Sequence, residues 1–121
     1  MTVLEERRRF PRYFAPEQFT AIGEFPPQRQ YRLKTKDIGI DGFGFVTEAD
    51  VSRENVFSLF FEVPGKNGRA EPINTLATII WYVYDKETSL YTAGAQFLGL
   101  KDSDKELLQG FLETLDAKSG G

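Results

Sequence analysis

The chain has no cysteine and no histidine among its 121 residues, and it has only one tryptophan. Without cysteine it forms no disulfide and no thiolate metal site, and without histidine it lacks the commonest metal ligand and general base. Asp41 and Glu48 are conceivable as paired catalytic carboxylates, but nothing in the sequence positions them. We therefore expect a protein that is not an enzyme and that holds no metal or cofactor.

Long hydrophobic runs are also missing. No apolar stretch approaches the roughly 20 residues that a membrane span requires, and no apolar segment follows the early charges as in a signal peptide. We therefore expect a cytoplasmic protein without a membrane partner. With 40% hydrophobic residues, including 11 phenylalanines, the chain is long enough for one well-packed domain.

The charges are unevenly distributed along the chain. Residues 1–36 contain 8 Lys/Arg against 4 Asp/Glu, whereas residues 37–121 contain 7 against 14. A general nucleic-acid-binding barrel would need a basic groove across the fold, so binding to RNA or single-stranded DNA is disfavoured. The asymmetry favours one local anion site near the N-terminus, although a solvated basic tail is the simpler alternative.

Short segments rich in β-branched and aromatic residues are separated by turn residues, which predicts an all-β fold. In Val56 to Val63 one face is entirely apolar, with Phe57, Leu59, Phe61 and Val63, and the other has Ser58, Phe60 and Glu62. The segments Ile73 to Tyr84 and Leu90 to Leu98 form a predicted long hairpin. Residues 102–115 change to helical spacing. The expected strands are Phe19 to Ile22, Gln30 to Thr35, Ile38 to Thr47, Val56 to Val63, Ile73 to Tyr84 and Leu90 to Leu98.

Six strands and one C-terminal helix predict a six-stranded antiparallel β-barrel, because closure removes unpaired strand edges and the helix can cover one end. We expect a flexible arginine arm at residues 1–15, the barrel with its helix at 16–116 and a disordered tail at 117–121. In the segment Ile38 to Thr47, glycines at 42 and 44 face opposite Phe43 and Phe45, which leaves room for something to approach the backbone.

Two motifs carry the chemistry. Arg8-Arg9-Phe10-Pro11-Arg12 has the form R-x-x-x-R, and Asp37-Ile38-Gly39-Ile40-Asp41-Gly42 has the form D-x-x-x-x-G. Arginine presents a planar fork of donors that fits phosphate oxygens and the O6/N7 edge of guanine. In this order and spacing, and over nearly the whole length, the chain resembles the PilZ domain family of bacterial receptors for cyclic di-GMP. An aromatic strand at Ile79-Ile80-Trp81 and the pattern Ala93-Gly94-Ala95-Gln96-Phe97 agree with this resemblance.

The resemblance implies a role for each motif residue. Arg8 and Arg12 would grip guanine edges and phosphates, and Arg7 would add a phosphate contact or stack on a base. Asp37 would accept hydrogen bonds from guanine or hold an arginine, and Gly42 would let the backbone approach the ligand or turn with positive φ. Arg9, Trp81 and Gly94 are candidates for the periphery of the site.

Gly39 departs from the family pattern, which has serine or alanine at this position. A missing hydroxyl bond typically costs about 0.5 to 1.5 kcal/mol, or roughly a factor of 2 to 12 in affinity. Gly39 would keep the floor of the site shallow. We therefore expect weakened binding of cyclic di-GMP, not abolished binding.

The predicted function is a cyclic di-GMP-binding regulatory domain whose arm changes conformation on binding and signals to an unidentified partner of the motility, adhesion or exopolysaccharide machinery. The alternative is a degenerate PilZ-like adaptor that acts through protein contacts without binding nucleotide, and Gly39 is the feature that favours it. Residues Asp37 to Gly42 are also compatible with an ordinary turn, and Trp81 and the phenylalanines with core positions.

Overall fold

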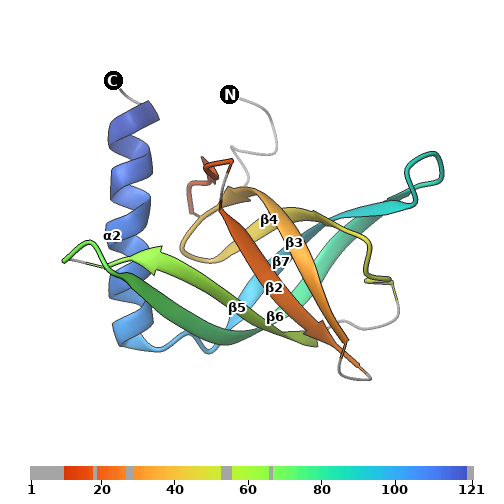
Figure 1. Ribbon diagram of the computed structural model, residues 1–121, viewed down its shortest axis with the longest axis horizontal. Coiled ribbons are helices and arrows are strands. Elements are labelled where there is room, and N and C mark those ends of the chain that lie inside the picture. Colours follow the sequence, from red (N-terminus) through yellow and green to blue (C-terminus); the bar gives the residue numbers. More distant parts are fainter. Residues whose placement is uncertain (1–9, 18, 27–28, 53–55, 66, 120–121) are drawn as a thin grey trace.

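Antiparallel strands make up most of the fold (Figure 1). The computed structural model describes residues 10–119 except residues 18, 27–28, 53–55 and 66. In chain order the elements are β1 (Tyr13–Phe14), β2 (Thr20–Phe25), β3 (Arg29–Ile38), β4 (Gly42–Thr47), β5 (Val56–Pro64), β6 (Ala70–Asp85), β7 (Leu90–Leu98) and α2 (Asp102–Ser119).

The strands pair in the order β1-β3-β2-β5-β6-β7-β4, and β3 also pairs with β4. This second pairing places Thr35 opposite Phe45 and Ile38 opposite Phe43, and it closes β2 to β7 into a ring. β1 lies outside the ring as a short addition to β3. The predicted six-stranded antiparallel barrel with one C-terminal helix is therefore confirmed.

One predicted strand is wrong. The segment Ile38 to Thr47 is not a single strand, because β3 ends at Ile38 and β4 begins at Gly42. The Gly39 N–H donates a hydrogen bond to the Gly42 carbonyl oxygen at 2.8 Å, which closes a tight turn between the two strands. The chain reverses at this turn, so β4 pairs antiparallel with the end of β3.

Alternating residues build the core inside the barrel. On β5 the inward positions Phe57, Leu59, Phe61 and Val63 are buried, as the period of two requires. Most of the phenylalanines join this core, as predicted, in a network of ring contacts 4.6 to 6.1 Å apart between centroids. The buried phenylalanines are Phe19, Phe25, Phe43, Phe45, Phe57, Phe61, Phe97 and Phe111.

α2 packs its apolar stripe against the barrel next to β5 (Figure 1). Phe111 stacks on Phe19 with ring centroids 5.4 Å apart, and Leu108, Leu112 and Leu115 are buried beside it. The helix runs to Ser119, so residues 117–119 are helical and not the tail that we expected. Ala117 and Lys118 are good helix formers, and no glycine or proline occurs between Gly110 and residue 120.

The described part of the N-terminal arm is hydrogen-bonded to β3. Tyr13 lies opposite Ile38 and Phe14 lies opposite Asp37 in an antiparallel pair. The Ala15 N–H adds a hydrogen bond of 2.9 Å to the Lys36 carbonyl oxygen. This pairing uses the part of β3 beyond the end of β2, so it places the residues just before β1 over the β3–β4 turn. No helix in the described part of the chain is long and apolar enough to cross a membrane.

Candidate functional site

The turn from Gly39 to Gly42 is held on both sides. In addition to the bond that closes it, the Asp41 carbonyl oxygen accepts a hydrogen bond from the Phe97 N–H at 2.9 Å, which ties the turn to β7. A Cβ atom on Gly42 would overlap the carbonyl oxygen of Ala95. Gly42 therefore permits close contact between β4 and β7, and its contact with a ligand stays a prediction.

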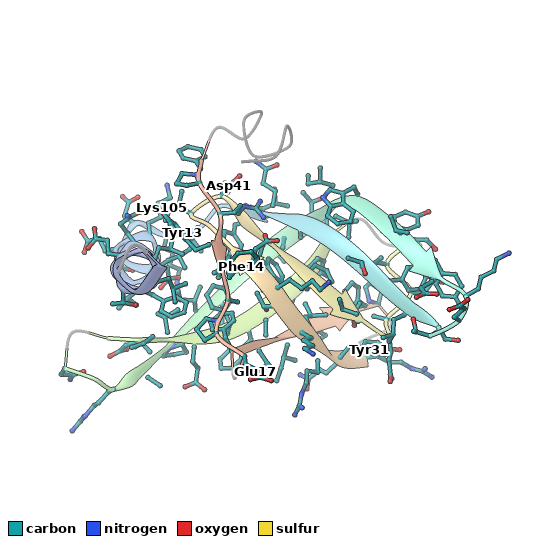
Figure 2. All side chains as sticks on the ribbon, turned by 90° about the horizontal axis from the view of Figure 1, so that it is seen from above. Tyr13, Phe14, Glu17, Tyr31, Asp41 and Lys105 are labelled. Atoms are coloured by element: carbon teal, nitrogen blue, oxygen red, sulfur yellow. The ribbon has the colours of Figure 1, made fainter. Side chains whose placement is uncertain are left out.

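Arg12 lies over this turn and forms two ion pairs. Its Nη1 donates to Asp37 Oδ1 at 3.0 Å, and its Nε donates to Asp41 Oδ1 at 3.2 Å. The Arg12 side chain is 14% exposed, against 30% for Asp37 and 26% for Asp41. The pairs are partly shielded from water, so the guanidinium is fixed in direction at the rim of the barrel. Figure 2 shows Asp41 at this rim, at the same end as Tyr13.

Two glycines make room for the pairs. A Cβ atom on Gly39 would lie 2.6 Å from the Pro11 carbonyl oxygen and 2.8 Å from Arg12 Cδ. On Gly44 a Cβ atom would lie 2.9 Å from Asp37 Oδ2. Real Cβ atoms do not approach so closely, so the missing side chains allow the arm and the Asp37 carboxylate to lie against the backbone.

Trp81 approaches the same region from the β6–β7 hairpin. It is paired with Gly94, where a Cβ atom would overlap the indole nitrogen and lie 2.7 Å from Cε2. A bulge between Ile79 and Trp81 inserts Ile80 as an extra residue, so the strict alternation of faces is interrupted here. Trp81 is 46% exposed. Its interpretation as a core residue is therefore wrong, and its interpretation as a residue near the site is supported.

These groups surround a pocket of about 270 Å³. Arg12, Asp37 and Asp41 form one side, and the β6–β7 hairpin forms the other. The residues that line the pocket are Arg12, Asp37, Asp41, Gly44, Ile80, Trp81, Gly94, Ala95 and Gln96.

The structure brings four of the predicted site residues together at this pocket, namely Arg12, Asp37, Trp81 and Gly94. Gly39 and Gly42 do not line it, because both lie in the supporting turn. Arg7, Arg8 and Arg9 lie outside the described residues.

Sequence reasoning missed several lining residues. Asp41 was considered only as a catalytic carboxylate, and Glu48, its suggested partner, does not line the pocket. Gly44 belongs to the glycine face of β4, and these glycines indicate that another group lies close to the backbone. At Gly44 that group is the Asp37 carboxylate. Ile80, Ala95 and Gln96 lie within the two patterns that supported the resemblance, so their positions in those patterns were the available signal.

The described lining residues carry one cation, Arg12, and two anions, Asp37 and Asp41. The pocket by itself is therefore slightly acidic, and further cations would have to come from elsewhere to hold an anionic ligand. Among the described residues, no group of three or more His, Cys, Asp or Glu side chains could hold a metal ion.

Comparisons with known proteins relate this fold to solved structures. The chain is similar to the PilZ domain of YcgR from Escherichia coli with c-di-GMP, at 20% identity and a TM-score of 0.66, over 93% of this chain and 94% of that chain. It is also similar to MrkH from K. pneumonia in complex with c-di-GMP, at 19% identity and a TM-score of 0.70, over 94% of this chain and 53% of that one.

A further similarity is to the Bacillus subtilis inhibitor of motility MotI/DgrA, at 18% identity and a TM-score of 0.69, over 89% of this chain and 51% of that chain. The chain thus spans about half the length of the MrkH and MotI chains that it matches. At these identities the likeness concerns the fold. No curated protein matches the sequence.

The family comparison is more specific. The PilZ domain model matches residues 6–114, which include both motifs, the barrel strands and most of α2. Arg12 from the first motif and Asp37 from the second meet at one pocket in a fold shared with PilZ structures. The chain therefore belongs to the PilZ domain family.

Proposed function

We propose that this chain is a regulatory domain that binds cyclic di-GMP, and that binding changes the conformation of its N-terminal arm and signals to a partner protein. Arg7, Arg8 and Arg12 would hold phosphates and guanine edges, with Asp37 holding Arg12 in direction or accepting from a guanine. Trp81 would offer its exposed indole to a base.

One observation carries the proposal. Arg12 and Asp37 are 25 residues apart in sequence, yet their side chains are 3.0 Å apart at the mouth of a pocket. The last arginine of one motif and the first residue of the other thus form one site. The solved PilZ structures with c-di-GMP, those of YcgR and MrkH, support the choice of ligand.

The size of the pocket supports a role for the arm. Pockets that enclose small ligands usually measure about 300 to 1,000 Å³, and this one measures about 270 Å³. It would enclose one part of a cyclic dinucleotide, and the remaining surface of the ligand would be covered by the arginines before Phe10. Closing the arm over a bound ligand would be a change in order that a partner can detect.

The test is calorimetry with cyclic di-GMP, run beside GTP and a linear dinucleotide as controls. Arg12→Ala should lower the affinity roughly 10- to 100-fold, because hydrogen bonds to charged groups contribute about 1.5 to 3 kcal/mol. Arg32→Ala is the matched control, since Arg32 is exposed on β3 and does not line the pocket. Failure of the wild-type chain to bind, or unchanged affinity in Arg12→Ala, would contradict the proposal.

A second candidate function is an adaptor that acts through protein contacts without nucleotide. The acidic balance of the described pocket favours it, because two carboxylates already neutralise Arg12. An NMR titration to high concentrations of cyclic di-GMP without shift changes at Arg12 or Trp81 would support the adaptor. A partner in the motility, adhesion or exopolysaccharide machinery is part of both proposals, and capture of that partner with and without ligand would identify it.

A further inference from the structure

The Arg12 side chain is engaged by two carboxylates that differ in their relation to the family motif. Asp37 is the first residue of that motif, whereas Asp41 occupies one of its unspecified positions. We infer that Asp41 competes with the ligand for Arg12 and thereby lowers the affinity of the site, an inference that rests on the proposed binding of cyclic di-GMP. Asp41 would thus set the ligand concentration at which the domain responds.

The geometry of the guanidinium separates the roles of the two acids. An arginine offers a pair of parallel donors along its Nε/Nη2 edge and another along its Nη1/Nη2 edge. Asp41 accepts from Nε at 3.2 Å and therefore occupies the first of these edges. Asp37 accepts from Nη1 at 3.0 Å and makes no hydrogen bond with Nε or Nη2. A phosphate or guanine that takes the Nε/Nη2 edge must displace Asp41 but not Asp37.

The backbone keeps Asp41 in this competing position. Its carbonyl oxygen is bound to the Phe97 N–H, and the turn around it is closed by the bond from Gly39 to Gly42. A carboxylate on so constrained a turn cannot withdraw with its backbone when a ligand arrives. Release of Arg12 must therefore come from rotation of side chains, and the negative charge stays at the mouth of the pocket.

That remaining charge acts against the ligand a second time. Cyclic di-GMP carries two phosphodiester groups, and each unit charge a few ångströms away in a partly shielded site interacts more strongly than in bulk water. Asp41 is 26% exposed, so its repulsion of a bound phosphate is only partly screened. Removing its charge should favour binding both by freeing Arg12 and by ending this repulsion.

Gly39 supports the same arrangement. With a side chain at this position, Pro11 and the stem of Arg12 could not lie so close to the turn, since a Cβ atom would be 2.6 Å from the Pro11 carbonyl oxygen. The departure from the family pattern at Gly39 and the acid at Asp41 thus act together. The first admits the arm, and the second holds its arginine.

The experiment is calorimetry with cyclic di-GMP on the full chain and on Asp41→Asn, which keeps the shape and removes the charge. We expect roughly two- to fivefold tighter binding for Asp41→Asn, in the range of a partly shielded ion pair. Glu113→Gln is the matched control, because it removes one negative charge from an exposed position on α2. Its affinity should equal that of the wild type.

Asp41→Ala removes any residual hydrogen bond and should bind at least as tightly as Asp41→Asn, with circular dichroism confirming that both variants are folded. A second readout does not need the ligand: the NMR signal of the Arg12 Nε–H should move in Asp41→Asn toward that of the exposed Arg32. Wild-type binding with no gain in either variant, or an Arg12 signal insensitive to residue 41, would overturn the inference and leave the proposed function intact. Absence of binding in all three proteins would overturn the proposed function, and this inference with it.

Discussion

The two sides of the pocket are built by different forces. The charged wall consists of Arg12, Asp37 and Asp41, which are held together by ion pairs between the arm, β3 and the β3–β4 turn. The aromatic wall consists of Ile80, Trp81 and Gly94. The Trp81 indole lies directly over Gly94, which has no side chain. The first wall is held by ion pairs that a ligand would have to replace under the proposed function, whereas the second is preformed by packing.

This difference assigns separate tasks to the two walls. Under the proposed function, the charged wall would distinguish anions from other ligands, and its strength would depend on salt because its charges are partly exposed. The aromatic wall would provide a flat surface for a base, and its strength would depend on contact area. Changes in each wall should therefore be distinguishable by experiment.

The largest effect is expected from breaking the aromatic wall. Gly94→Ala should lower the free energy of unfolding by about 1 to 3 kcal/mol, because the added Cβ overlaps the indole of Trp81 and forces it away. Chemical denaturation measures the loss, and the emission of the single tryptophan should shift as its surroundings change.

Gly110→Ala is the matched control for this substitution. Apart from its chain neighbours and the backbone of its own helix, no described atom lies within 4 Å of a Cβ at Gly110 in α2, so the variant should be more stable by about 0.5 to 1 kcal/mol. Equal stability of Gly94→Ala and wild type, with unchanged emission, would mean that Trp81 does not lie over Gly94.

A smaller effect, the loss of affinity in Trp81→Ala, should differ from the loss in Arg12→Ala in its dependence on salt. Trp81→Ala should reduce the affinity for cyclic di-GMP roughly 5- to 10-fold, at the low end of the about 1 to 3 kcal/mol that a stacked base contributes. This loss should be nearly the same at low and high salt, whereas the loss in Arg12→Ala should shrink as salt is added. Titrations of both variants at two ionic strengths measure the difference.

Tyr82→Ala serves as the control for the aromatic wall. Tyr82 is a neighbouring exposed aromatic residue that does not line the pocket, so its removal should leave the affinity unchanged. If Trp81→Ala and Arg12→Ala respond equally to salt, the division of the pocket into two kinds of wall is incorrect.

The smallest effect concerns Tyr91 on β7, which does not line the pocket and provides an internal reference. A side-chain hydrogen bond with Asp50, with a further contribution from burial, raises the pKa of Tyr91 above its ordinary value of 10.0. The folded state thus favours the neutral phenol, so this contribution to stability is complete below pH 10 and is lost as the pH rises through the folded-state pKa.

Asp50→Asn should lower the pKa of Tyr91 toward its ordinary value, as measured by the absorbance of the phenolate, and should leave binding of cyclic di-GMP unchanged. An unaltered titration would show that Asp50 does not control Tyr91. A change in ligand affinity would show that the pocket and this part of the hairpin are not independent.

Most of the fold could be predicted from local patterns. The alternation in β5, the aromatic hairpin of β6 and β7 and the helical spacing after residue 102 each reflect a periodicity that neighbouring residues impose. The break at Gly39 was misplaced, because its position depends on one backbone hydrogen bond between Gly39 and Gly42. The bulge at Ile80 was equally invisible, since it depends on how β6 pairs with β7.

The site was predicted only in part, because local patterns name some of its residues and tertiary contacts decide the rest. Arg12 and Asp37 could be named because their residue types and spacing match a family motif, and Trp81 and Gly94 because they lie in the supporting patterns. The role of Asp41 could not be predicted, since it depends on a carboxylate and a guanidinium that meet across 29 residues of sequence. The ligand contacts of Arg7, Arg8 and Arg9 stay predictions, as does the weakened binding of cyclic di-GMP due to Gly39.

The sequence by itself determined the family, the barrel with its closing helix and the residue types available to an anion site, because periodicity and motif spacing are local properties of the chain. Tertiary structure alone decided that Gly42 packs against β7, that Gly94 accommodates an indole and that Asp41 engages Arg12. Each of these depends on the approach of segments distant in sequence, and that approach follows from closure of the barrel.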